Sequence, residues 1–189
     1  MIGKKNIVFG FLYLVLTAAL GPLMIAQHFE PRNAAESAKQ EKLGALQQAA
    51  ESGYEVNLQP MKPEEIAKAA AGAALAVSAR LNAQAPIDAI KGGPHAHGNL
   101  EALLNIAVGI ALAFIAVPVV FKQVISWVFI AGAVLHSGLL YLVVVLQQPW
   151  AAKILGSPFG VIGPLLILLG LALAGIAAAM GFKGQPVKD

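Results

Sequence analysis

The sequence predicts an all-α membrane protein: a four-transmembrane-helix bundle with an external, largely helical segment between the first two helices. Of its 189 residues, 58% are hydrophobic and 12% are charged, against about 45–50% and about 25% in ordinary soluble domains. Four uninterrupted apolar stretches are each long enough to cross about 30 Å of hydrocarbon as a helix. Eight of the ten acidic and seven of the thirteen basic residues lie between positions 28 and 91. That segment therefore belongs in water.

The apolar stretches define the organisation of the chain. They cover residues 7–26, 100–121, 124–146 and 161–182. We expect residues 1–27 to form the N-terminus and first span, residues 28–98 the external segment, and residues 99–189 the other three spans with the C-terminus. Pro22 and Pro118 would then lie inside helices, where each removes a hydrogen bond and can kink the path.

The first stretch has an alternative interpretation as a cleaved signal peptide, because Lys4 and Lys5 precede it. Its apolar core is long, however, and Met24-Ile25-Ala26 lacks the small residue that a cleavage site requires. We therefore expect the first helix to be retained.

The lysines that flank the spans predict the orientation. Lys4, Lys5, Lys122, Lys183 and Lys188 fall on one side, and only Lys153 falls on the other. Because basic residues accumulate on the cytoplasmic side, both termini should be cytoplasmic. Trp127 and Trp150 suit the two membrane–water interfaces as anchors.

Composition also excludes several classes of site and partner. The chain has no cysteine, which excludes disulfides and thiolate metal ligands. A net charge of +3 without any basic run argues against a nucleic-acid partner. The expected partners are the lipid bilayer, a second copy of the chain and a protein docked on the external segment.

Two features support the protein partners. The fourth span carries Gly163, Gly170, Gly175 and Gly181, and such small residues let helices approach closely in lipid. This helix should pack tightly, against another subunit if a homo-oligomer forms. In the external segment, residues 33–52 and 63–83 are rich in strong helix formers, so a helical pair joined by a connector at 54–61 is expected.

Histidines cluster at the outer interface. His28, His95 and His97 lie there together with Glu30 and Glu101, and imidazole and carboxylate groups suit zinc, copper or iron. The alternative is structural: solvated histidines, Asn99 as a helix N-cap and Glu101 as an acid in the first turn.

If the second span begins at Pro94, then His97, Glu101 and Asn105 form one polar stripe at helical spacing. Polar groups inside a membrane are costly and mark ligand, ion or proton sites. His136, Ser137 and Tyr141 on the third span are the possible partners, although a single buried histidine also serves as a structural hydrogen-bond donor.

Depth restricts which of these groups can meet. With a tight turn at residues 122–123, Asn105 and Tyr141 lie at about 24 and 25 Å from the cytoplasmic end. His136 would lie at about 18 Å and His97 at about 36 Å. The two histidines are therefore not expected to be opposite ligands of one haem.

The central hairpin resembles the styrene oxide isomerases at Ala96-His97-Gly98, Asn105-Ile106-Ala107-Val108 and Leu140-Tyr141-Leu142. Those proteins are four-helix membrane enzymes that bind haem b and convert an epoxide to an aldehyde. The resemblance implies haem b, with His97 as its ligand and Asn105 and Tyr141 beside the substrate.

We therefore expect a haem or metal site between the second and third spans, in an isomerase or redox enzyme that acts on a small apolar substrate. The expected catalytic residues are Asn105 and Tyr141, the cofactor-binding residues are His97, Glu101 and His136, and the metal ligands are His97, His95 and His28. The alternative is a non-enzymatic assembly subunit that docks a partner through its external segment.

Overall fold

The computed structural model describes residues 1–56 and 59–187 and confirms an all-α protein with a four-helix bundle. The chain divides into two compact units. One combines Met1–Gly21 with Ala89–Asp189, and the other is Pro22–Asp88. Four helical segments are long and apolar enough to cross a membrane: Lys4–Glu51, Pro63–Phe114, Val119–Val144 and Pro158–Gly181. The chain is thus an integral membrane protein.

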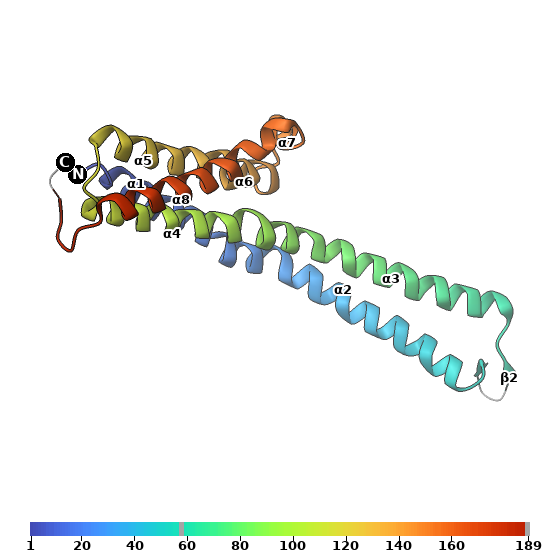
Figure 1. Cartoon of the computed structure of the whole chain (residues 1–189). Helices are drawn as coiled ribbons and strands as arrows, with labels where there is room; N and C mark the ends of the chain where they lie inside the picture. Colours follow the sequence, from blue (N-terminus) through green and yellow to red (C-terminus); the bar gives the residue numbers. More distant parts are fainter. Residues whose placement is uncertain (57–58, 188–189) are drawn as a thin grey trace. The chain divides into compact units, whose positions relative to one another are not determined.

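The first unit is the bundle, in which α1, α4, α5 and α8 run side by side (Figure 1). Its helices are α1 (Lys4–Ala18), α4 (Ala96–Ala111), α5 (Val119–Ala133), α6 (Leu139–Val144), α7 (Pro149–Leu155) and α8 (Ile162–Gly181). Two π-helical turns interrupt the pattern, Lys91–His95 before α4 and Val134–Gly138 between α5 and α6. Short 3-10 turns lie at Leu112–Phe114 and Pro158–Val161.

The turn between the second and third spans does not lie at residues 122–123 as expected. A 3-10 turn ends at Phe114, Ile115 is extended, and Pro118 is the N-cap of α5. Proline has no N–H for a preceding carbonyl and disfavours helical backbone in the residue before it. Pro118 therefore lies between the helices rather than inside one. The turn is fastened to the end of α8, where Ala116 N–H donates to the Gly181 carbonyl at 2.7 Å.

The earlier position of the turn also changes the expected environment of Lys122. We expected it in a cytoplasmic loop, but it lies inside α5 and is 1% exposed. It therefore does not belong with the solvated lysines that indicate orientation.

Glycines bring the helices of the bundle into contact. A Cβ added at Gly3 would lie 1.9 Å from the Gly109 carbonyl oxygen, and one at Gly10 would lie 2.7 Å from the Ala102 carbonyl oxygen. Helices α1 and α4 thus meet backbone to backbone. Around this contact and the α5–α8 contact lies the apolar core: Val108, Leu112, Ile115, Ile125, Phe129, Ile167 and Ala177.

The glycines of α8 pack mainly within the chain. Gly163 faces the backbone of Leu135, Gly170 faces the Phe129 ring, and Gly181 faces the backbone of Ala116. A Cβ added at Gly175 would meet no atom of another part of the described chain within 4 Å. The close packing expected for this helix is present, and most of its glycines contact other helices and turns of the same chain.

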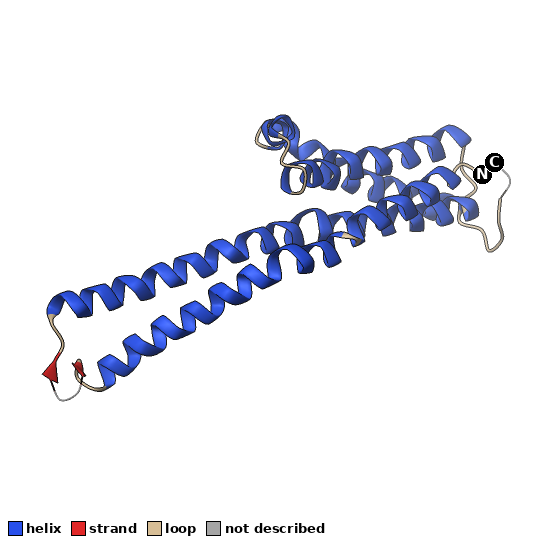
Figure 2. Ribbon diagram, turned by 180° about the vertical axis from the view of Figure 1, so that it is seen from behind, coloured by secondary structure: helices blue, strands red, loops and turns tan. Residues whose placement is uncertain are grey.

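The second unit is a helical pair, formed by α2 (Leu20–Glu51) and α3 (Pro63–Ile90), which lie side by side in Figure 2. Two short antiparallel strands, β1 (Glu55–Val56) and β2 (Gln59–Pro60), join them. The two expected helices are confirmed, but both extend further toward the bundle unit in sequence than predicted. Residues 57 and 58 of the expected connector lie outside the described residues.

A charged cluster links the two helices of this pair. Glu36 on α2 accepts from Arg80 Nε on α3 at 2.8 Å, and Lys39 Nζ lies 2.5 Å from the same carboxylate. Hydrogen bonds from Lys39 and Arg80 lower the pKa of Glu36 from 4.5 to about 2.

Candidate functional site

The candidate site lies where α1, α4 and the π-helical turn Val134–Gly138 meet. A π turn inserts an extra residue into a helix and is frequent at functional sites. Here it carries His136, which is partly buried, and Ser137, which is fully buried. Both side chains turn toward Glu101 of α4, which is 3% exposed.

Glu101 is the centre of a hydrogen-bonded chain. His136 Nδ1 lies 2.5 Å from Glu101 Oε1, and Ser137 Oγ donates to Oε2. The Tyr13 hydroxyl on α1 lies 2.8 Å from Ser137 Oγ. We call these four residues the Glu101 cluster. A buried carboxylate is costly unless it is paired and hydrogen-bonded, and here both of its oxygens have partners.

His97 extends the cluster to the surface of the bundle. Its ring lies 4.7 Å from the ring of His136, centroid to centroid, with an interplanar angle of 56°. His97 itself is exposed. The chain thus runs from an exposed imidazole through His136 and Glu101 to Ser137 and Tyr13.

This contact corrects the expected depths of the two histidines. Because the turn lies at residues 115–118, His97 precedes Phe114 by as many residues as His136 follows Val119. They therefore stand at the same level, where a turn at residues 122–123 would have separated them by about 18 Å at 1.5 Å per residue. Glu101, His136 and His97 are brought together.

Asn105 and Tyr141 are placed differently from expectation. Asn105 Oδ1 accepts from Asn6 Nδ2 at 2.9 Å, and its amide donates to the backbone carbonyls of Glu101 and Phe129. Asn105 is thus level with Phe129, and Tyr141 follows Phe129 by 12 residues, or about 18 Å at 1.5 Å per residue. The expected equal depth of Asn105 and Tyr141 is therefore wrong. Tyr141 instead lines an apolar cavity.

His95 has a structural partner. His95 Nδ1 lies 2.9 Å from the Thr17 carbonyl oxygen, and Thr17 Oγ1 donates to Asn99 Oδ1 at 2.8 Å. Asn99 and Glu101 lie inside α4, so their interpretation as N-cap and first-turn acid is wrong. His28 belongs to the other compact unit.

No group of three His, Asp or Glu residues that could hold a metal ion occurs within residues 1–56 and 59–187. The structure therefore provides no support for the metal site expected from His28, His95 and His97. His97 and His136 remain the two imidazoles in contact.

Several site residues were missed from the sequence. Asn6, Tyr13 and Thr17 project from α1 toward α4 and α5, and Ser126 joins Asn6. Asn6, just before the first apolar stretch, and Gly10, Tyr13 and Thr17 within it recur at helical spacing. That spacing was a signal for a face turned toward protein.

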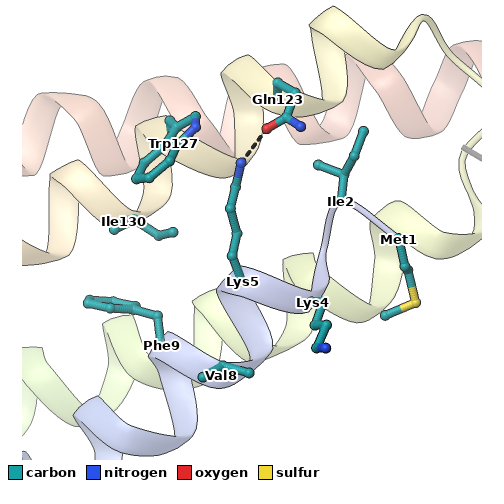
Figure 3. A pocket seen from close by; sticks show the side chains of 9 residues that line it. All are labelled: Met1, Ile2, Lys4, Lys5, Val8, Phe9, Gln123, Trp127 and Ile130. Carbon is teal, nitrogen blue, oxygen red and sulfur yellow. Dashed lines mark hydrogen bonds between the residues drawn. The ribbon is translucent and has the colours of Figure 1, made fainter.

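Cavities open among the described residues of this unit, and two of them bear on the site. One, of about 770 Å³, surrounds the start of α1; there Lys5 points between Trp127 and Gln123, while Lys4 points away (Figure 3). Lys5 Nζ donates to Gln123 and lies 4.5 Å from the centre of the Trp127 ring. The other cavity, of about 500 Å³, is lined by both Tyr13 and Tyr141. It is thus the cavity that adjoins the Glu101 cluster.

Comparisons of the chain with family models, curated proteins and solved structures found no match.

Proposed function

We propose that this integral membrane protein binds haem b through His97, beside the Glu101 cluster, and acts on a small apolar substrate as an isomerase or redox enzyme. The observation that carries the proposal is the exposed His97 ring held against His136, whose Nδ1 is bonded to the buried Glu101. An ionisable chain of this kind within membrane helices points to function.

The geometry favours one histidine as the haem ligand. Metal–nitrogen bonds of about 2.0–2.1 Å would put the ring centroids of two opposite ligands about 6 Å apart, more than the 4.7 Å between these two. His97 and His136 thus do not fit as opposite ligands of one iron. His97 is exposed, so a flat macrocycle has access to it, whereas His136 is partly enclosed by the helices.

The residues around His97 have distinct roles in this proposal. Haem iron supplies Lewis-acid or redox chemistry when it is bound. Glu101 fixes the orientation of His136 through Nδ1, and His136 contacts His97. Ser137 and Tyr13 link the same carboxylate to the apolar cavity, so a proton can be held or passed along the cluster.

An absorption spectrum of the protein purified in detergent tests the proposal. We expect a Soret band and about one haem per chain, and we expect His97→Ala to lose both. His28→Ala is the matched control, because His28 lies in the other unit, and it should keep the haem. Absence of a Soret band from wild-type protein expressed with haem supplied would overturn the proposal.

For the orientation, we propose cytoplasmic termini. Lys4, Lys5 and Lys183 lie near the two ends of the described chain. Lys153 lies in α7, beyond the opposite end of α5–α6. Lys188 lies outside the described residues. Because the chain has no cysteine, single cysteines at Gly184 and Gly44 report the two sides cleanly. A membrane-impermeant maleimide should label only position 44 in intact cells, and the reverse pattern would refute this orientation.

A second function is favoured by the external pair. Its exposed apolar side chains include Leu75 at 71% and Leu81 at 62% exposure, which a docked partner would cover. In this case the protein is an assembly subunit. Leu75→Ser with Leu81→Ser should then abolish recovery of a partner from native membranes, whereas His97→Ala should leave recovery unchanged.

A further inference from the structure

The apolar cavity of about 500 Å³ lies between α1, the π-helical turn with α6, and α7. Its wall includes Leu16, Leu135, Leu142 and Trp150, together with the phenols Tyr13 and Tyr141. Cavities of roughly 300–1,000 Å³ with apolar walls and few polar groups are typical small-molecule sites. A ligand of this cavity must also match its few polar groups.

The direction of the hydrogen bonds in the Glu101 cluster determines whether the cavity offers a ligand a donor or an acceptor. With Glu101 as a carboxylate, both of its oxygens accept, one from His136 and one from Ser137. A serine hydroxyl has one proton, and Ser137 directs it at the Glu101 carboxylate and the Ala133 carbonyl oxygen, which leaves none for Tyr13. Tyr13 must therefore donate its own proton to Ser137 Oγ, 2.8 Å away.

Tyr13 lines the cavity, and its hydroxyl lies beside Gly138 of the same wall, 3.6 Å from where a Cβ on Gly138 would be. On this wall Tyr13 can serve a ligand as an acceptor. Its phenol oxygen keeps acceptor capacity after its proton is used on Ser137. A ligand that offers only acceptors, such as an ether, would leave this oxygen unmatched. A ligand with a hydroxyl would complete a chain that runs from the ligand through Tyr13 and Ser137 to Glu101.

The cavity is also accessible from the sides of the helices. Leu16 is 56% exposed and Trp150 is 52% exposed, on surfaces of membrane-crossing and adjoining helices where lipid is the solvent. An uncharged apolar molecule partitions into lipid and can enter from there, whereas a charged one is excluded by its desolvation cost.

We propose that this cavity binds a small uncharged alcohol or phenol whose hydroxyl donates to the Tyr13 oxygen. The inference deepens the proposed function by naming a class of substrate, and to that extent rests on it. Binding in the cavity, however, is measured without reference to haem.

Calorimetry on the full chain in detergent tests the inference with 4-butylphenol and its methyl ether, 4-butylanisole. The pair differs in the hydrogen-bond donor and shares the ring, chain and acceptor oxygen. We expect wild-type protein to bind the phenol about fivefold to tenfold more tightly than the ether, as one net hydrogen bond provides. Tyr13→Phe should reduce this ratio to about one. Partition into the micelle cancels when variants are compared in the same detergent.

Tyr141→Phe is the matched variant, since Tyr141 lines the same cavity but is not the residue bonded to Ser137. It should keep the phenol preference. If Tyr141→Phe abolishes the preference and Tyr13→Phe keeps it, the inference is overturned. Equal affinity of wild-type protein for both probes would also overturn it and would indicate a cavity filled by lipid chains.

Two further measurements keep the result interpretable. Leu142→Trp should fill the cavity and weaken both probes at least tenfold, whereas Leu168→Trp, on the exposed side of α8, should weaken neither. The Soret band is recorded on every variant and reports the His97 site. A haem-containing protein without phenol preference refutes the cavity inference alone, and a haem-free protein with the preference refutes the proposed function alone.

Discussion

The Nδ1 atom of His136 lies 2.5 Å from Oε1 of Glu101, and this contact joins the two halves of the hairpin formed by α4, α5 and the π-helical turn. Ser137, the next residue, donates to the other carboxylate oxygen. One acidic side chain thus holds two consecutive residues of the turn and, through Ser137, the Tyr13 hydroxyl on α1. The Glu101 cluster is therefore both a structural joint and the centre of the candidate site.

Glu101→Gln should lower the free energy of unfolding by about 1–3 kcal/mol, the cost of leaving a buried polar partner imperfectly satisfied. An amide presents only one acceptor oxygen, whereas His136 and Ser137 each bond to a carboxylate oxygen. The measurement is unfolding by dodecyl sulfate, followed by far-ultraviolet circular dichroism. Glu30→Gln, at an exposed position of α2, is the control and should change stability by less than about 0.5 kcal/mol. Equal effects would contradict a structural role for the cluster.

Asn6 and Asn105 should be energetically coupled. Asn6 Nδ2 donates to Asn105 Oδ1 at 2.9 Å, joining α1 to α4 inside the bundle. A double-mutant cycle of Asn6→Ala and Asn105→Ala should give a coupling of about 0.6–1.7 kcal/mol, as interhelical hydrogen bonds in membranes do. Asn6→Ala combined with Asn99→Ala should be additive within about 0.5 kcal/mol, because Asn99 bonds Thr17 instead. Additivity in both cycles would argue against the Asn6–Asn105 bond.

Gly109→Ala and Gly175→Ala should have opposite effects on stability. A Cβ at Gly109 would lie 2.7 Å from the Gly3 carbonyl oxygen, so α1 must move away; such overpacking costs about 1–3 kcal/mol. A Cβ at Gly175 would meet nothing within 4 Å beyond its own helix in the part of the chain that the structure describes, and alanine is favoured over glycine in a helix by up to about 1 kcal/mol. Thermal unfolding in detergent measures both. A loss of dimeric mass on Gly175→Ala would reveal a second copy of the chain at this face.

Glu36 should make the stability of the α2–α3 pair depend on pH. Its pKa is lowered from 4.5 to about 2 by the Lys39 and Arg80 hydrogen bonds. A lowered pKa in the folded state means that the stabilisation is fully present above the ordinary pKa and is lost as the pH falls toward 2. The difference in melting temperature between wild type and Glu36→Gln should therefore be largest above pH 5 and shrink between pH 4.5 and 2.

Salt and a second variant provide the controls for this pH dependence. Exposed ion pairs are screened by salt, so about 1 M sodium chloride should reduce the difference. Arg80→Met removes one of the two cations and should reduce it as well. A wild-type pH profile that coincides with that of Glu36→Gln would show that the cluster does not act on stability.

Part of the site could be read from the sequence. Glu101, His136 and Ser137 were recognised because polar residues inside long apolar stretches need partners, and His97 because it precedes Glu101 by one helical turn. The contacts between these residues could not be predicted, because they depend on where the chain turns between the second and third spans. Residues 115–123 contain no charged residue before Lys122, so the expected turn was placed at the lysine, whereas Pro118 marks its true end.

The sequence by itself determined that four helices can cross a membrane and that a charged helical pair lies between the first two. Both follow from local composition, because span length and solvation depend on consecutive residues. Only the tertiary structure decided that His97 meets His136, that Asn105 meets Asn6 and that Tyr13 reaches Ser137. These contacts depend on the register between helices. Two features set that register: the position of the turn between α4 and α5, and the close approach of α1 and α4 at Gly3, Gly10 and Gly109.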